Sequence, residues 1–191
     1  EKAVALAPSD ASIKAQFGLL KMDSADTSGI DALKEAITLN PRLESANIAL
    51  ANNYMQNGEI DKAIQIAEQW LQSNPDSVPA TLLRGNIALK ESKADVASEY
   101  FQKATELDKE NIIPLFNLAV IAAEQDNIDE SNRLLKQLIA INIEYPYAYR
   151  LAIQNAIKQD RERALENSLQ QLIHENETAI WPRIILARRY I

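Results

Sequence analysis

Residues 40–75, NPRLESANIALANNYMQNGEIDKAIQIAEQWLQSNP, hold two helical patterns enclosed by two Asn-Pro pairs. Proline cannot continue a helix and asparagine tolerates the left-handed conformation, so each Asn-Pro pair marks a helix end. Between them, Asn57-Gly58 is a turn signal that divides the stretch. The sequence therefore predicts two consecutive helices, near 44–56 and 60–73, joined by a short turn.

The same pattern recurs along the whole chain. Polar residues that follow apolar helical stretches lie 34 residues apart, at Asn40, Asn74, Asp108, Asn142 and Asn176. Small residues preceded by larger ones recur at a similar spacing, at Gly18, Ala51, Gly85, Ala119, Ala152 and Ala187. A further series lies in the second helices, at Ala63, Ala97, Ser131 and Leu165. Such a period indicates stacked helical repeats, in which the small residues let helix axes approach closely.

The repeats predict an all-α fold with a regular layout. The first helices are expected near 11–23, 44–56, 78–91, 112–125, 146–158 and 180–191. The second helices are expected near 28–40, 60–73, 94–107, 128–142 and 162–175. We expect one solenoid over 1–191, with repeats near 10–43, 44–77, 78–111, 112–145 and 146–179 and partial helices at 1–7 and 180–191. The first and fifth copies each show a one-residue slip.

These residues resemble the tetratricopeptide repeat (TPR) family. That family pairs a large and a small residue in its first helix, then an aromatic, followed by small residues and a closing proline in the second. One block matches at Leu50, Ala51, Tyr54, Gly58, Ala63 and Pro75, and the next at Gly85, Ala97, Phe101 and Ala104. The resemblance implies an α-solenoid, a right-handed superhelix of about five helix pairs, whose concave surface binds proteins or peptides.

Composition limits the other possibilities. The 191 residues carry a formal net charge of -7, which argues against nucleic acid as a partner. The chain has no cysteine, so disulfides and thiolate metal sites are excluded. No apolar run approaches the roughly 20 residues of a membrane helix. The sequence begins without methionine, and we expect it to be a piece of a longer protein.

The resemblance also implies which residues line the groove, because the family uses defined places of each first helix. These places carry Ile48, Asn52, Met55, Leu82, Asn86, Leu89, Phe116, Asn117, Val120, Tyr149, Arg150 and Ile153. Asn52 and Asn86 occupy equivalent places, and an amide can both donate to and accept from a peptide backbone. Two alternatives remain open: either asparagine can bond a neighbouring helix instead, and the apolar residues can belong to the stacking core.

No residue set in the sequence forms a catalytic, cofactor or metal site. His174 is the only histidine, and near a helix end it complements the helix dipole. Glycine-rich phosphate loops and nucleophile elbows are absent from the sequence. We therefore expect no enzymatic activity and no cofactor in this chain.

A narrower resemblance concerns the stretches at 29–41, 58–77 and 101–119. They are similar to parts of bacterial TPR lipoproteins that accompany exosortase (PEP-CTERM) sorting and exopolysaccharide systems. This would imply a cell-envelope location, with lipid attached upstream; otherwise the location is unknown, or cytoplasmic.

Three functions remain open. The first is a scaffold that binds an extended peptide or a partner helix. The second is a self-assembling spacer, including an end-to-end homodimer through apolar residues near the two ends, Ala3, Val4, Leu6, Ile184, Ile185, Leu186 and Tyr190. The third is an accessory region of an enzyme whose catalytic domain lies elsewhere.

Overall fold

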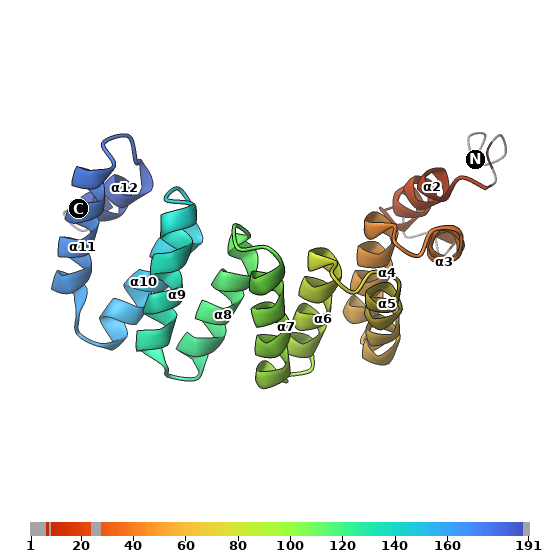
Figure 1. Cartoon of the computed structure of the whole chain (residues 1–191), viewed down its shortest axis with the longest axis horizontal. Helices are drawn as coiled ribbons and strands as arrows, with labels where there is room; N and C mark the ends of the chain where they lie inside the picture. Colours follow the sequence, from red (N-terminus) through yellow and green to blue (C-terminus); the bar gives the residue numbers. More distant parts are fainter. Residues whose placement is uncertain (1–6, 8, 24–27, 189–191) are drawn as a thin grey trace. The chain divides into compact units, whose positions relative to one another are not determined.

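The computed structural model describes residues 7, 9–23 and 28–188, and these residues contain eleven α-helices and no strand (Figure 1). The expected all-α fold is confirmed. Ala3, Val4, Leu6 and Tyr190 lie outside the described residues.

The helices form two compact units, unit 1 over 1–107 and unit 2 over 108–191. Unit 1 contains α2 (Ala11–Asp23), α3 (Ser28–Leu39), α4 (Glu44–Gln56), α5 (Ile60–Ser73), α6 (Val78–Lys90) and α7 (Ala94–Leu107). Unit 2 contains α8 (Ile112–Glu124), α9 (Ile128–Ile141), α10 (Pro146–Lys158), α11 (Glu162–Glu175) and α12 (Trp181–Arg188). That both units belong to one continuous solenoid stays a prediction.

Helix ends lie close to where the sequence predicts them, and at the starts of α6 and α8 a side chain in the preceding turn satisfies a free backbone group. Ser77 Oγ accepts a hydrogen bond from the Ala80 N–H at 3.2 Å at the start of α6. Asn111 Oδ1 accepts one from the Ile113 N–H at 3.1 Å at the start of α8. These caps occupy donors that a helix start leaves without a partner.

The turn inside a helix pair needs one residue in the left-handed conformation. Gly58 has φ of 75°, and residues at successive steps of 34 have φ of 60° (Ser92), 66° (Asp126) and 53° (Asp160). A side chain in this conformation crowds the following carbonyl, which glycine avoids. The repeat therefore places the same left-handed backbone position at the four turns from residue 58 to residue 160.

We expect Ser92→Gly to stabilise the protein and Gly58→Ser to destabilise it, each by about 1 kcal/mol. Both residues are exposed, so few contacts change in either variant. Urea denaturation followed by circular dichroism would measure both effects. Equal shifts of the same sign in the two variants would contradict the strain argument.

Each unit has two layers. In unit 1, α2 contacts α4 and α4 contacts α6, while α3, α5 and α7 each pack on the helix before them. In unit 2, α8 contacts α10 and α10 contacts α12 in the same way. The first helices therefore form one layer in each unit, and the residues between the layers form its core.

The third copy has an arginine at a core position. Arg84 is 9% exposed and occupies the place that Leu50 and Leu118 occupy in the copies on either side. Its Nε lies 3.6 Å from a Glu68 carboxylate oxygen, and its Nη1 lies 3.7 Å from one of Glu91. The guanidinium also lies 5.2 Å from the centre of the Tyr100 ring. Two carboxylates and an aromatic face thus compensate the buried charge.

Candidate functional site

The first concavity, which we call the asparagine groove, lies between α4 and α6 of unit 1. Its walls are Asn52, Met55 and Gln56 of α4 and Asn86, Leu89 and Lys90 of α6. These are three pairs of residues 34 apart, so each place on α4 is matched on α6. Four of the six residues, Asn52, Met55, Asn86 and Leu89, are among those expected from the sequence.

The two asparagine amides of this groove are available to a ligand. Both side chains are exposed, and within the described part of the chain neither has a hydrogen-bond partner. Asn47 behaves differently, because it is buried and its Nδ2 donates to Pro41 O at 3.0 Å and Leu43 O at 2.9 Å. Asn47 therefore has a structural role, whereas Asn52 and Asn86 hold no helix in place.

Ile48 and Leu82 lie one turn before the two asparagines and are half-buried. Ile48 packs against the core of unit 1, and neither residue is among those that line the asparagine groove.

The second concavity, which we call the aromatic groove, lies between α8 and α10 of unit 2. It is lined by Phe116, Val120, Ala123, Glu124, Ile128, Tyr147, Arg150, Leu151, Gln154, Asn155 and Lys158. The structure thus brings together the expected residues Phe116, Val120 and Arg150.

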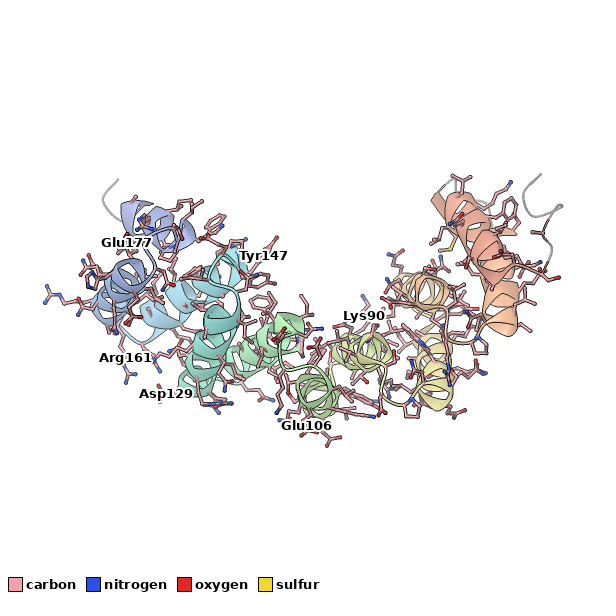
Figure 2. The ribbon with its side chains drawn as sticks, turned by 45° about the horizontal axis from the view of Figure 1, so that its top comes forward. Lys90, Glu106, Asp129, Tyr147, Arg161 and Glu177 are labelled. Atoms are coloured by element: carbon pink, nitrogen blue, oxygen red, sulfur yellow. The ribbon has the colours of Figure 1, made fainter. Side chains whose placement is uncertain are left out.

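Three aromatic rings meet at one end of this groove. The Phe116 ring centre lies 5.4 Å from that of Tyr145 and 6.3 Å from that of Tyr147. The two tyrosine rings lie 5.5 Å apart, and Tyr147 is 52% exposed (labelled in Figure 2). Arg150 is exposed and has no ion-pair partner among the described residues. The groove therefore combines an aromatic wall with a free positive charge.

Three expected residues lie elsewhere. Asn117 is half-buried and does not line the aromatic groove. Tyr149 is 1% exposed, and its hydroxyl donates to Ile143 O at 2.7 Å. Ile153 lines a separate cavity with α11 and α12. Tyr149 therefore belongs to the core of unit 2.

For Tyr149 and Ile153 the physical reason is the register of α10, that is, which of its residues correspond to those of α8. The expected set for this helix assumes a one-residue slip, whereas a strict step of 34 from Phe116 and Val120 leads to Arg150 and Gln154. Those two residues do line the aromatic groove. Sequence reasoning missed Gln154 for this reason, and the unbroken spacing was the signal that could have found it. Tyr147 was missed because it has no counterpart among the expected residues of the preceding copy.

The buried phenol of Tyr149 predicts a late step in an alkaline titration. Burial, and next the negative charge of Glu144, raise the pKa of Tyr149 from 10.0 to about 12. Since the pKa is raised in the folded state, this contribution to stability is complete below pH 10.0 and is lost as pH rises through about 12.

An absorbance titration of the tyrosines should therefore show a step near pH 12 that Tyr149→Phe removes. Ionisation of every tyrosine near the ordinary value in the folded protein would contradict this expectation.

Within residues 7, 9–23 and 28–188, neither a metal site nor a membrane-spanning helix is found. Over this part of the chain, no three His, Asp or Glu side chains gather closely enough to hold a metal ion. In the same residues, no helix is both long and apolar enough to span a membrane. His174 lies in the last turn of α11, as the sequence predicts.

Known proteins are similar to this chain first in sequence and second in fold. Residues 21–86 and 79–111 each match a family model described as a tetratricopeptide repeat. The human protein O-mannosyl-transferase TMTC3 is 29% identical over 136 residues, which are 70% of this chain and 15% of that protein. The chain therefore spans only a small part of this curated relative.

Two solved structures share the fold. Pseudomonas aeruginosa pilF has a TM-score of 0.71 at 15% identity, covering 98% of this chain and 86% of that one. YrrB, described as a TPR protein with an unusual peptide-binding site, has a TM-score of 0.62 at 16% identity, covering 100% of this chain and 97% of that one.

Proposed function

Since residues 21–111 belong by sequence to the tetratricopeptide repeat family, we propose that this chain is a protein-interaction scaffold that binds an extended peptide in the asparagine groove. TPR proteins generally mediate protein–protein interactions. The observation that carries the proposal is the pair of amides of Asn52 and Asn86 at equivalent places on adjacent repeats, both exposed and without a hydrogen-bond partner in the part of the chain that the structure describes.

The chemistry of the groove suits a peptide backbone. An extended segment offers N–H and C=O groups that no secondary structure satisfies, and each asparagine amide can pair with both. Met55 and Leu89, three residues after the two asparagines, supply apolar surface in the same groove. Each hydrogen bond contributes about 0.5–1.5 kcal/mol net, so two of them hold the peptide in a defined register.

The aromatic groove of unit 2 is a second surface for the same class of partner. Its three rings offer apolar area to side chains of a peptide, and Arg150 offers a positive charge to a carboxylate. We propose that it takes an apolar residue next to an acidic one.

Peptides selected on the wild-type chain from a displayed random library would test the asparagine groove. Asn52→Ala/Asn86→Ala should weaken binding of a selected peptide by roughly 5- to 150-fold in fluorescence anisotropy, the loss of two hydrogen bonds. Gln69→Ala/Gln102→Ala, two exposed residues of the second helices α5 and α7, is the matched control and should leave binding unchanged.

Circular dichroism must show equal helicity in all variants. Selected peptides that bind the asparagine variant as tightly as the wild type would overturn the proposed groove. A library that yields no binder would overturn the scaffold function itself.

The similarity to TMTC3 favours a second candidate, an accessory repeat region of a larger transferase. The matched part is 15% of that protein, so its name describes a chain much longer than this one. On this proposal the 191 residues bind but do not catalyse. Mannosyl transfer by the purified chain would contradict it.

Two further proposals remain, a self-assembling spacer and a function in the cell envelope. A self-assembling spacer would use exposed apolar side chains such as Ile157 and Ile180, which are 58% and 60% exposed. Light scattering that shows a monomer at high concentration would remove the end-to-end homodimer. The cell-envelope function rests on the resemblance to bacterial exopolysaccharide and exosortase lipoproteins, and copurification with such a system would test it.

A further inference from the structure

The helix pair α10–α11 differs from the other pairs in the size of the residues at the point where its two helices cross. Counting in steps of 34 from Gly85, the first helices have Ala119 and then Ile153 at the crossing point. The second helices have Ala97, then Ser131, and then Leu165 at the matching place. Only in α10–α11, among these pairs, are both residues large and branched.

Small residues at this point allow close approach. An added Cβ on Gly85 would lie 2.6 Å from the Phe101 ring, and one on Gly29 would lie 2.6 Å from the backbone oxygen of Gly18. Branched side chains in both places of α10 and α11 must hold the two helices further apart, because neither can be accommodated at such distances.

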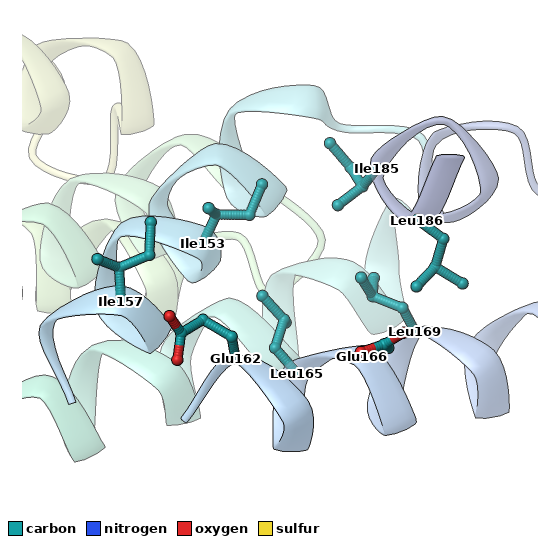
Figure 3. A pocket seen from close by; sticks show the side chains of 8 residues that line it. All are labelled: Ile153, Ile157, Glu162, Leu165, Glu166, Leu169, Ile185 and Leu186. Atoms are coloured by element: carbon teal, nitrogen blue, oxygen red, sulfur yellow. The ribbon is translucent and has the colours of Figure 1, made fainter. Parts of the chain in front are cut away.

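The separation leaves a cavity of about 390 Å³ between α10, α11 and α12, which we call the wedge cavity. Its lining residues are Ile153, Ile157, Leu165, Leu169, Ile185 and Leu186, with Glu162 and Glu166. Figure 3 shows the aliphatic side chains of the three helices around one common space.

A long-range cap holds α12 in place as one wall of the wedge cavity. The Glu144 carboxylate, from the turn before α10, accepts hydrogen bonds from the N–H of Ile180 at 2.7 Å and of Trp181 at 3.2 Å. These donors begin α12 and have no partner inside the helix. The cavity is therefore bounded on all three sides by anchored elements of unit 2.

The wedge cavity is lined by apolar side chains together with two carboxylates. Six of its eight lining residues are aliphatic, and the other two are glutamates. Glu162 is half-buried and has no ion-pair partner within the described residues. An anionic lipid or fatty acid would bring a second negative charge to the Glu162 carboxylate, whereas a lysine or arginine would complement it.

We propose that the wedge cavity binds a basic amphipathic helix of a partner protein, with a leucine or isoleucine in the cavity and a lysine or arginine at Glu162. Helices bind apolar grooves through anchors one turn apart, which matches a cavity bounded by helix faces with a charge at its edge. This site belongs to unit 2 alone and does not depend on the asparagine groove.

Two synthetic helical peptides with the same leucine pattern provide the probe, one with lysine and one with glutamate at the flanking positions. The lysine peptide should bind the wild-type chain at least about fivefold more tightly, measured by fluorescence anisotropy at low salt. Glu162→Gln should reduce this preference, and Glu177→Gln, a change in the exposed turn before α12, should not.

A variant that fills the wedge cavity tests whether the peptide occupies it. Leu169 is buried and lines the wedge cavity, so the larger side chain of Leu169→Phe takes up part of the cavity volume and should weaken the lysine peptide about tenfold. Helicity equal to that of the wild type by circular dichroism shows that the variant is folded.

Equal binding of the two peptides, or binding that neither Glu162→Gln nor Leu169→Phe changes, would overturn the proposal. Sedimentation of a wild-type dimer that Leu169→Phe converts to a monomer would also overturn it, since a second copy would then be the occupant.

Discussion

Replacing Phe101 by alanine is expected to lower the free energy of unfolding by about 3–5 kcal/mol. The side chain is 0% exposed and lies between α7 and α6, where its ring occupies the space left by Gly85. No neighbour can fill the cavity after truncation, because Gly85 has no side chain and its backbone is held in α6. The loss therefore includes both the burial of the ring and the empty volume.

Urea denaturation followed by circular dichroism would measure this loss. Gln102→Ala, one residue further along α7 on its exposed side, is the matched control and should change stability by less than about 0.5 kcal/mol. A loss below about 1 kcal/mol in Phe101→Ala would mean that α6 and α7 close over the gap, contrary to the packing described here.

Replacing Gly29 by alanine is expected to cost about 1–3 kcal/mol, although alanine is the better helix former. The added Cβ would lie 2.6 Å from the Gly18 carbonyl oxygen and 2.9 Å from the Met22 backbone nitrogen. Both atoms belong to the backbone of α2, so they cannot move aside as a flexible side chain could. The two helices must separate, which weakens the packing of α2 on α3.

Helix propensity alone makes the opposite prediction for this variant, a gain of about 1 kcal/mol. The sign of the change in thermal denaturation therefore decides between the two effects.

The repeat spacing predicted the helices closely because each end is determined by local chemistry. The expected ranges 44–56, 60–73 and 94–107 coincide with α4, α5 and α7. Asparagine, proline and the left-handed turn residue act within a few residues of the chain. Tertiary packing therefore has little to add to these boundaries.

The candidate site was less predictable, since side-chain environment depends on what packs against each helix. Asn47 and Asn52 lie on the same helix, yet one is buried with two hydrogen bonds and the other is exposed with none in the described residues. Tyr149 and Tyr147 differ in the same way, at 1% and 52% exposed. Residue type does not separate the members of either pair.

The sequence by itself determined the helix pairs, their turns and the equivalence of Asn52 with Asn86, because these follow from a period of 34 and from local backbone preferences. Only the tertiary structure decided which side chains are available to a ligand. It also decided that Ile153 and Leu165 face a common cavity, because the spacing between two helices depends on the residues of both at their crossing.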